Sequence, residues 1–365
     1  MGDKKEKELK IAINIHPLKT GHKDRGTGLY TINLLENLKK DNSLIIQEFA
    51  NLSEVEDADV IHFPWFDFFF HTLPIKRKFK TIVTIHDTIP LVFPNYYPVG
   101  LRGQFNFFLQ KLALNTCKSI ITDSRVSKDD IVEYLKIEKE KISTVYLAAN
   151  ENFKPQSDTK LLHIKRKYHL PDRFLLYVGD ANWVKNLPFL IEGFNNLIKT
   201  PNFSDVKLAL IGGVFLKKVE NIDHPELESL KKVNELIKKN NLDKYILRPG
   251  GLDLNELVCF YNLATLYVQP SLYEGFGLPV IEALSCGTPV ASSNKGSLLE
   301  TGGNAVIYFD PSNLNQFISI LKEVLQDKSL QDKLSKLGLK RVKDFSWEKA
   351  LKETKDIYLK TLRND

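Results

Sequence analysis

The chain has 365 residues, enough for two domains of ordinary size, because domains average roughly 150 residues. It is 43% hydrophobic and 26% charged, which excludes a mainly disordered chain. Its net charge of +6 is smaller than a dedicated nucleic-acid binder usually carries, so we expect no nucleic-acid partner.

The first half of the sequence alternates short apolar runs with amphipathic stretches. In chain order, the pattern predicts strands at 9–15, 59–63, 81–85, 119–122 and 141–145. It predicts helices at 28–39, 105–114 and 127–135. Short apolar strands that alternate with helices are typical of a parallel sheet with helices on its faces.

The polar and basic segment 151–172 contains two prolines and is expected to link two domains. A second alternation follows, with strands predicted at 174–178, 206–211, 246–248, 266–269, 289–291 and 305–309. Helices are predicted at 187–198, 226–240, 255–263, 279–284, 314–326 and 329–342. The fold class is therefore α/β, with two doubly wound, Rossmann-like domains.

The sequence gives two hints about the cellular compartment. Cys117, Cys259 and Cys286 lie far apart without metal-ligand spacing, which favours reduced thiols. The charged N-terminus lacks the apolar stretch of a signal peptide, and no run of about 18 apolar residues is present. We expect a cytoplasmic protein.

The segment 273–283, YEGFGLPVIEA, carries the strongest chemical signal. Glu274 and Glu282 flank a Gly-x-Gly turn and Pro279, a residue that suits the first turn of a helix. The glycines let the backbone approach a ligand, and N–H groups at a helix start favour an anion. Two arbitrary glutamates are usually a loop and a surface residue. The intervening glycines and proline favour two carboxylates that accept hydrogen bonds from sugar hydroxyls.

This segment resembles the retaining nucleotide-sugar glycosyltransferases of family 4, and the similarity covers nearly the whole chain. That family has the GT-B fold, in which two Rossmann-like domains face each other across a cleft. The resemblance implies that Glu282 holds the nucleotide ribose and that Glu274 meets hydroxyls of the donor sugar. It also implies that the intervening backbone contacts sugar and phosphate, through Gly275, Phe276, Gly277 and Leu278.

The resemblance also implies how the domains are divided. Residues 1–160 would form an acceptor-side domain and residues 161–345 a nucleotide-sugar donor domain. The last helix, within 346–365, would return to the first domain.

A second motif follows the strand predicted at 174–178, which ends at Gly179. Lys185 comes just before the next helix, where an ammonium group can face a diphosphate. A lone loop lysine is usually a solvated charge, but the resemblance implies a diphosphate-binding lysine here. The family often has an arginine right after the glycine, where this chain has Asp180. Arg248 is the candidate substitute for that missing positive charge.

The residues RGTG at 25–28 follow the first strand and open the first helix. They lack the third glycine of a dinucleotide fingerprint. The resemblance implies that Gly26, Thr27 and Gly28 form a glycine-rich loop that lets donor phosphate and acceptor approach backbone N–H groups. Arg25 either touches an anionic group or faces solvent.

His86 lies at the end of the strand predicted at 81–85, where an imidazole could contact a sugar or phosphate. A lone histidine is more often structural. The pattern His-Asp-x-x-Pro, however, resembles a mannosyltransferase-like branch of the family. That resemblance implies contact of His86 with the donor sugar and β-phosphate. Asp87 is the candidate to orient the imidazole.

Residues 63–70 and 93–114 are unusually rich in aromatic side chains. They predict either core packing in the first domain, an apolar acceptor groove, or a peripheral membrane-contacting edge. The basic residues that would help such an edge are Lys76, Arg77, Lys78 and Lys80.

We therefore predict a hexosyltransferase with His86, Glu274 and Lys185 as catalytic residues. Mannose from GDP-mannose is the favoured donor, and a saccharide or lipid-linked saccharide of a surface polysaccharide, such as O-antigen, is the acceptor. The expected cleft loops lack an Asp-x-Asp motif, and lysine and backbone amides can stabilise the leaving diphosphate, so no metal or cofactor is expected. The alternatives are a GT-B nucleotide-sugar epimerase and a non-enzymatic glycan- or nucleotide-binding protein.

Overall fold

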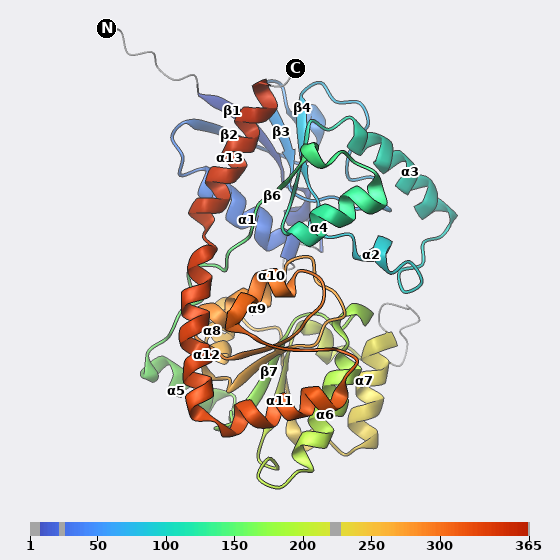
Figure 1. Cartoon of the computed structure of the whole chain (residues 1–365). Helices are drawn as coiled ribbons and strands as arrows, with labels where there is room; N and C mark the ends of the chain where they lie inside the picture. The colour runs from blue at the N-terminus through green and yellow to red at the C-terminus, as the bar shows by residue number, and fades with distance from the viewer. Residues whose placement is uncertain (1–7, 22–25, 220–227, 364–365) are drawn as a thin grey trace. The chain divides into compact units, whose positions relative to one another are not determined.

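The computed structural model describes residues 8–21, 26–219 and 228–363, and it divides into two compact units (Figure 1). The first unit comprises Met1–Pro94, Pro98–Leu147 and Ser346–Asp365, and the second comprises Asn95–Tyr97 and Ala148–Phe345. The first unit thus takes up the C-terminal segment. The division falls after Leu147, earlier in the chain than the boundary expected at residue 160.

The described part of the first unit is built on a six-stranded parallel sheet with the order β2-β1-β3-β4-β5-β6. The central strands β3, β4 and β5 are short, buried and apolar, as strands covered by helices on both faces must be. The strands are β1 Leu9–Asn14, β2 Leu44–Phe49, β3 Val60–Phe63, β4 Lys80–Thr84, β5 Ser119–Thr122 and β6 Ile142–Thr144.

The helices of the first unit include one that comes from the far end of the chain. They are α1 Gly26–Leu38, α2 Ile89–Val92, α3 Leu101–Asn115, α4 Arg125–Asp130 with a π-helical continuation Ile131–Leu135, and α13 Trp347–Arg363. Short 3-10 turns lie at His16–Lys19, Leu52–Glu54 and Lys139–Lys141.

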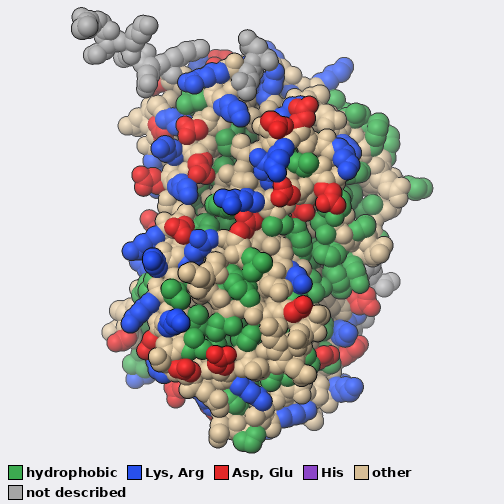
Figure 2. Space-filling model, viewed as in Figure 1, with side chains coloured by type: hydrophobic (Ala, Val, Ile, Leu, Met, Phe, Trp, Pro, Cys, Tyr) green, Lys and Arg blue, Asp and Glu red, His purple; other side chains and the backbone are tan. Residues whose placement is uncertain are grey.

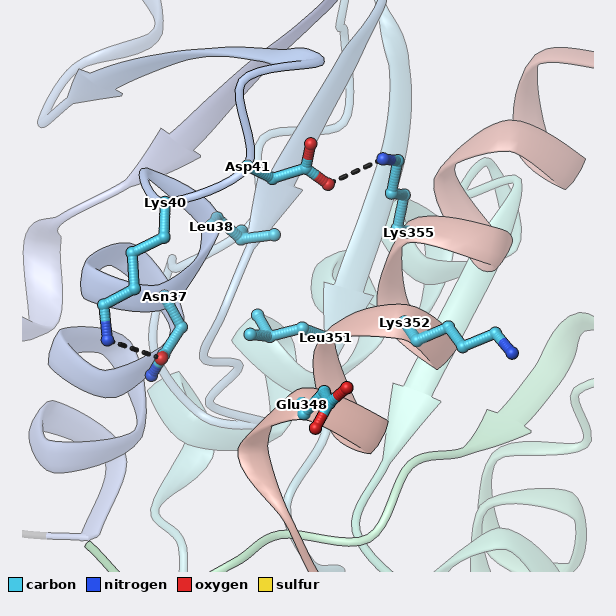
Figure 3. A pocket seen from close by; sticks show the side chains of 8 residues that line it. All are labelled: Asn37, Leu38, Lys40, Asp41, Glu348, Leu351, Lys352 and Lys355. Carbon is cyan, nitrogen blue, oxygen red and sulfur yellow. Dashed lines mark hydrogen bonds and ion pairs between the residues drawn. The ribbon is translucent and has the colours of Figure 1, made fainter. Parts of the chain in front are cut away.

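Helix α13 is held in the first unit by buried polar contacts and an ion pair. The Tyr358 hydroxyl lies 2.7 Å from Nδ1 of the fully buried His62 in β3. Lys355 donates to Asp41 at 2.6 Å, beside a pocket of about 450 Å³ between α1 and α13 (Figure 3). Lys355 holds the pKa of Asp41 down at about 2, chiefly through this hydrogen bond.

The second unit carries another sheet that is six-stranded in its described residues, parallel and ordered β12-β11-β10-β7-β8-β9. Apolar clusters that include alternate residues of β7 pack around it, Leu175 and Tyr177 in one and Phe174 and Leu176 in the other. The strands are β7 Phe174–Val178, β8 Lys207–Ile211, β9 Ile246–Gly250, β10 Leu266–Gln269, β11 Val290–Ser293 and β12 Ile307–Phe309.

The second unit has two helices that the sequence analysis did not predict, α5 Asp158–Lys167 and α10 Leu298–Gly302. The others are α6 Leu187–Ile198, α7 Glu228–Lys239, α8 Leu254–Leu263, α9 Leu278–Ser285, α11 Leu314–Gln326 and α12 Lys328–Arg341. Short 3-10 turns lie at Trp183–Lys185, Gly213–Leu216, Asp243–Tyr245, Gly303–Ala305 and Val342–Asp344. Helix α5 lies inside the expected linker 151–172, and its Ile164 is buried in the core of this unit. The linker prediction was wrong here, because a mostly charged helix shows little apolar periodicity.

In each sheet the strand order reverses at one point, between β1 and β3 in the first and between β7 and β10 in the second. Open α/β sheets bind ligands outside the carboxyl ends of the strands at such points. Gly26 begins the helix after β1, Lys185 follows β7 and Glu274 follows β10. The candidate residues therefore lie at the edges where this architecture binds ligands. Among the described helices, none is both long and apolar enough to cross a membrane.

Candidate active site

The centre of the candidate site in the second unit is an ion pair between Lys185 and Glu274. Lys185 ends the short 3-10 turn Trp183–Lys185 after β7, and Glu274 lies in the loop after β10. The Lys185 ammonium donates to Oε1 of Glu274 at 2.8 Å and to Oε2 at 2.9 Å. Because β7 and β10 are paired neighbours, two residues far apart in sequence meet at the same edge of the sheet.

Two polar side chains that sequence reasoning missed complete the environment of Glu274. Gln269, the last residue of β10, donates to Oε1 of Glu274 at 2.7 Å, and the Ser271 hydroxyl donates to the same oxygen at 2.7 Å. The carboxylate is buried and accepts four hydrogen bonds, which fixes its orientation. The signal that could have found them is their type: polar residues in Gln-Pro-Ser directly after a buried apolar strand.

The loop that carries Glu274 is held by side chains of the segment 292–305. The Ser297 hydroxyl donates to the Glu274 carbonyl at 2.9 Å, and the Thr301 hydroxyl donates to the Phe276 carbonyl. Gly296 has a φ of +58°, and a Cβ there would lie 2.8 Å from both N and O of Glu274. Glycine is therefore required where this backbone passes Glu274.

Glu282 lies in the second turn of α9, which Gly277 precedes as N-cap with a φ of +86°. Its carboxylate is buried and accepts a hydrogen bond of 2.8 Å from the Tyr261 hydroxyl of α8. Burial raises the pKa of Glu282 to about 7, although the bond from Tyr261 opposes the rise. Without a ligand, both the charged and the neutral form of this carboxyl group are therefore populated near pH 7.

The structure does not join Arg248 to this cluster. Arg248 lies in β9, and its guanidinium donates to Asn234 of α7 at 3.0 Å. Burial lowers its pKa, and the described residues show no contact between Arg248 and Lys185 or Glu274. Asp180, in the position where the family often has arginine, accepts from the Ala181 N–H after Gly179. The proposed substitution of Arg248 for that arginine stays a prediction.

His86 is the centre of the candidate site in the first unit, and it follows β4 directly. Its Nδ1 donates to Asp123 at 2.6 Å and its Nε2 donates to the Pro64 carbonyl at 3.0 Å. Both partners can only accept, so the geometry selects the doubly protonated imidazolium. Burial alone would lower the pKa of His86, but the charge and hydrogen bond of Asp123 and the Pro64 carbonyl outweigh it, and the pKa is raised. The Tyr30 ring meets the imidazole edge-on at 4.8 Å.

The prediction that Asp87 orients the His86 imidazole was wrong. Asp87 instead accepts the Ile89 N–H at 3.0 Å, at the start of α2. Asp123 follows β5, the strand next to β4, and its carboxylate faces the imidazole. Adjacent residues point in different directions, whereas residues that follow neighbouring parallel strands can face each other.

The glycine-rich segment opens α1, where Gly26 is exposed and Gly28 is buried. The Thr27 hydroxyl oxygen is buried and has no hydrogen-bond partner within the described residues. Arg25 lies outside the residues that the structure describes.

The aromatic segments divide between core and surface. Phe63, Phe66 and Phe68 are buried in the core of the first unit, as the simpler interpretation predicted, whereas Phe105 and Phe108 of α3 are exposed. Two of the four basic residues expected at a surface edge donate hydrogen bonds to backbone carbonyls in the described structure. Arg77 donates to the Ala113 carbonyl at 2.9 Å, and Lys80 donates to the Leu362 carbonyl at 2.9 Å.

No group of three or more His, Cys, Asp or Glu side chains that could hold a metal ion is found in the part of the chain described. Metal independence stays a prediction.

Two family models match the chain. The model of glycosyltransferase family 4 matches residues 24–152, and that of the group 1 glycosyl transferases matches residues 160–341. The first match includes His86, and the second includes Lys185, Glu274 and Glu282.

Similar proteins include bacterial mannosyltransferases. The O-antigen chain mannosyltransferase B of Escherichia coli is 28% identical over 77% of this chain and 71% of its own length. The serotype-specific mannosyltransferase WbdA of Escherichia coli is 29% identical over 73% of this chain. The matched part spans only 32% of WbdA.

Solved structures show the same fold. A sucrose-phosphate synthase from Thermosynechococcus elongatus superposes with a TM-score of 0.76 at 19% identity, over 98% of this chain and 100% of its own. Anabaena HepE, in a complex with UDP-glucose, gives a TM-score of 0.75 at 14% identity, over 98% of this chain and 100% of its own. Both matches confirm the predicted GT-B class of fold. With matched family models over most of its length, the chain belongs to the family 4 and group 1 glycosyltransferases and is a glycosyltransferase of the GT-B fold.

Proposed function

We propose that this enzyme transfers a hexose, mannose in the first place, from a nucleotide-diphosphate sugar to a saccharide or lipid-linked saccharide acceptor. The observation that carries the proposal is the Lys185–Glu274 pair at the switch point of the second sheet. Relatives named as O-antigen mannosyltransferases support mannose, with GDP-mannose as donor, and assembly of a surface polysaccharide. A cytoplasmic location is part of the same proposal.

The proposal divides donor recognition between the two glutamates. Glu282, buried in α9, would accept hydrogen bonds from the ribose hydroxyls, which replace part of the hydration that burial removed. Glu274 would accept from hydroxyls of the donor sugar. The amides from Gly275 to Leu278 at the start of α9 would face the phosphates, and Arg248 remains a candidate contact.

Lys185 would stabilise the diphosphate. In the described structure its ammonium is paired with Glu274, so its charge is already neutralised. An arriving diphosphate would share the ammonium with Glu274. The negative charge of the leaving group would then be met by a cation that the protein has already oriented, and the transfer would need no metal.

In the chemical step, the bond between the anomeric carbon and the diphosphate oxygen breaks. The acceptor hydroxyl forms the new bond on the same face, and its proton passes to the leaving phosphate oxygen. A doubly protonated His86 cannot accept that proton, so its role would be to donate a hydrogen bond and supply positive charge. The loop at Gly26, Thr27 and Gly28 would leave room for phosphate and acceptor.

The test begins with a thermal-shift comparison of GDP-, UDP- and dTDP-sugars, since only a bound donor stabilises the fold. Nucleoside diphosphate release is then measured with the stabilising donor and candidate acceptors. We expect GDP-mannose to stabilise the wild-type protein and Lys185→Met to abolish that shift. Lys165→Met, which alters the exposed pair with Asp172, is the matched control and should retain the shift.

Three outcomes would contradict the proposal. An acceptor-independent change in the nucleotide sugar would indicate an epimerase. Binding without diphosphate release under any acceptor would indicate a non-enzymatic binding protein. Stabilisation by UDP- or dTDP-sugars alone would exclude GDP-mannose.

A further inference from the structure

Helix α3 presents a stripe of large apolar side chains to the outside of the first unit. Leu101, Phe105, Phe108 and Leu112 are 85%, 62%, 58% and 41% exposed. At about 100° per residue, these four positions lie within roughly 60° of one another around the helix axis. Figure 2 shows hydrophobic side chains gathered on this side of the first unit, where Figure 1 places α3. Phe70, in the loop between β3 and β4, is 67% exposed.

The inner face of the same helix buries Ala113 and Leu114 in the core, but two of its buried positions are polar, which is unusual for a surface helix. Asn106 and Gln110 are buried, and Asn106 donates to the Phe69 carbonyl at 2.8 Å. Gln110 accepts from the Leu73 N–H at 3.0 Å and donates to the Leu73 carbonyl at 2.9 Å. These bonds satisfy the backbone of the loop between β3 and β4. Rotating the helix to hide its apolar stripe would leave those buried polar groups unpaired, so the stripe is fixed on the outside.

Positive charge surrounds the stripe. Arg102 and Lys111 lie on α3 roughly 80–100° to either side of it, and α3 has no acidic residue. Lys76 and Lys78 are exposed in the loop that Asn106 and Gln110 hold against the helix. Residues 67–118 contain seven Lys or Arg and two acidic residues, Asp67 and Asp87, so most of the net charge of +6 arises here.

The charges decide between two occupants of this surface. In a symmetric pair of α3 helices, Arg102 and Lys111 would flank the seam on both sides and meet the same positive charges of the copy. An anionic lipid bilayer instead offers apolar depth for the aromatic rings and negative headgroups for the flanking cations. Long Arg and Lys side chains can reach those headgroups while their stems lie along the apolar surface.

We propose that the apolar face of α3, with Phe70 and the flanking Arg102 and Lys111, docks the first unit onto an anionic lipid surface. The interaction is peripheral: the helix would lie in the interface plane with its stripe inserted. It goes beyond the proposed transfer reaction and does not depend on which sugar is moved.

The test is flotation of the full chain with vesicles of phosphatidylcholine alone or with about 30% phosphatidylglycerol. We expect the wild-type protein to float with the anionic vesicles and to be largely released at about 1 M salt, where charges are screened within a few ångströms. Phe105→Ser combined with Phe108→Ser should lower the partition coefficient at least ~tenfold, because it removes the most exposed rings of the stripe. Arg102→Gln combined with Lys111→Gln should reduce binding to the anionic vesicles to the level seen with phosphatidylcholine.

The matched control is Leu162→Ser, which removes a leucine that is 46% exposed on α5 in the second unit. It should float as the wild-type protein does. All variants should keep the wild-type circular dichroism spectrum and melting temperature, because the altered side chains are exposed or, for Lys111, partly exposed. Failure of the wild-type chain to float, or equal flotation of the double phenylalanine variant, would overturn the proposal. Light scattering that shows a dimer abolished by the same variant would assign the surface to a second copy instead.

Discussion

Replacing Glu282 with glutamine should stabilise the ligand-free protein at alkaline pH while weakening donor binding. The pKa of this buried carboxyl group is raised from its ordinary 4.5 to about 7, chiefly by burial. At ~1.4 kcal/mol per tenfold change in proton affinity, the ionised form lowers folding stability by roughly 3 kcal/mol. A raised carboxyl pKa favours the folded state while the group is protonated. The contribution is present below about pH 4.5 and is lost as the pH rises through about 7.

The assay is urea unfolding of wild-type and Glu282→Gln protein at about pH 5 and about pH 8. Glutamine is neutral at both and can still accept the hydrogen bond from Tyr261. We expect similar free energies of unfolding at the lower pH. At the higher pH, the free energy of unfolding of the variant should exceed that of the wild-type protein by up to ~3 kcal/mol. Donor affinity should fall about 10- to 100-fold, because hydrogen bonds to a charged group contribute ~1.5–3 kcal/mol.

The matched control is Glu256→Gln on α8, where the pKa of the carboxyl group is shifted in the opposite direction. Lys167 holds the pKa of Glu256 below its ordinary value through a hydrogen bond, so removing this charge should not stabilise the protein at alkaline pH. The reasoning about Glu282 is refuted if the variant loses as much stability as the wild-type protein between the two pH values. It is also refuted if donor affinity is unchanged.

Three further predictions concern His86, Gly296 and Lys355. Turnover should fall as pH rises through the raised pKa of His86. Asp123→Asn should move this alkaline fall in turnover to lower pH. A fall that stays at the same pH would exclude the His86–Asp123 ion pair as its cause. Gly296→Ala should raise the donor KM at least ~tenfold, since the new Cβ would lie 2.8 Å from the backbone of Glu274. Unchanged kinetics would show that the loop carrying Glu274 does not hold the donor. Lys355→Met should lower stability by only about 1 kcal/mol, because its ion pair is partly exposed (Figure 3). That difference is present above about pH 4 and should vanish as pH falls through about 2, which urea unfolding against pH measures.

The sequence predicted most of the architecture because central parallel strands are short, apolar runs. One strand, β2, was not predicted from the sequence, because its residues do not form a continuous apolar run. It lies at the edge of the first sheet, and its Ile45 is 42% exposed and its Glu48 is also exposed, beside the partly buried Gln47. An edge strand needs neither a continuous apolar run nor strict alternation. Its mixed sequence therefore resembles a loop until its pairing with β1 is known.

The candidate site was predicted residue by residue, but its contacts were not. Lys185 and Glu274 were assigned to diphosphate and sugar as separate functions, whereas the structure joins them in one ion pair. They are 89 positions apart, and only the pairing of β7 with β10 brings the two loops together. Sequence spacing cannot show that pairing. The two strands that follow β7 in the chain, β8 and β9, lie on one side of it, and β10 pairs with β7 on the opposite side.

The partner of His86 shows the same dependence on strand order. Sequence reasoning chose Asp87 because it is adjacent, yet the carboxylate that faces the imidazole is Asp123, beyond the neighbouring strand β5. That pairing changes the chemistry, since a buried carboxylate at one nitrogen and the Pro64 carbonyl at the other hold the ring doubly protonated. A ring oriented by Asp87 alone could have served as a base. While it is doubly protonated beside Asp123, His86 can only donate hydrogen bonds and supply positive charge, so under the proposed function it would act on the leaving phosphate or the donor sugar and not on the acceptor proton.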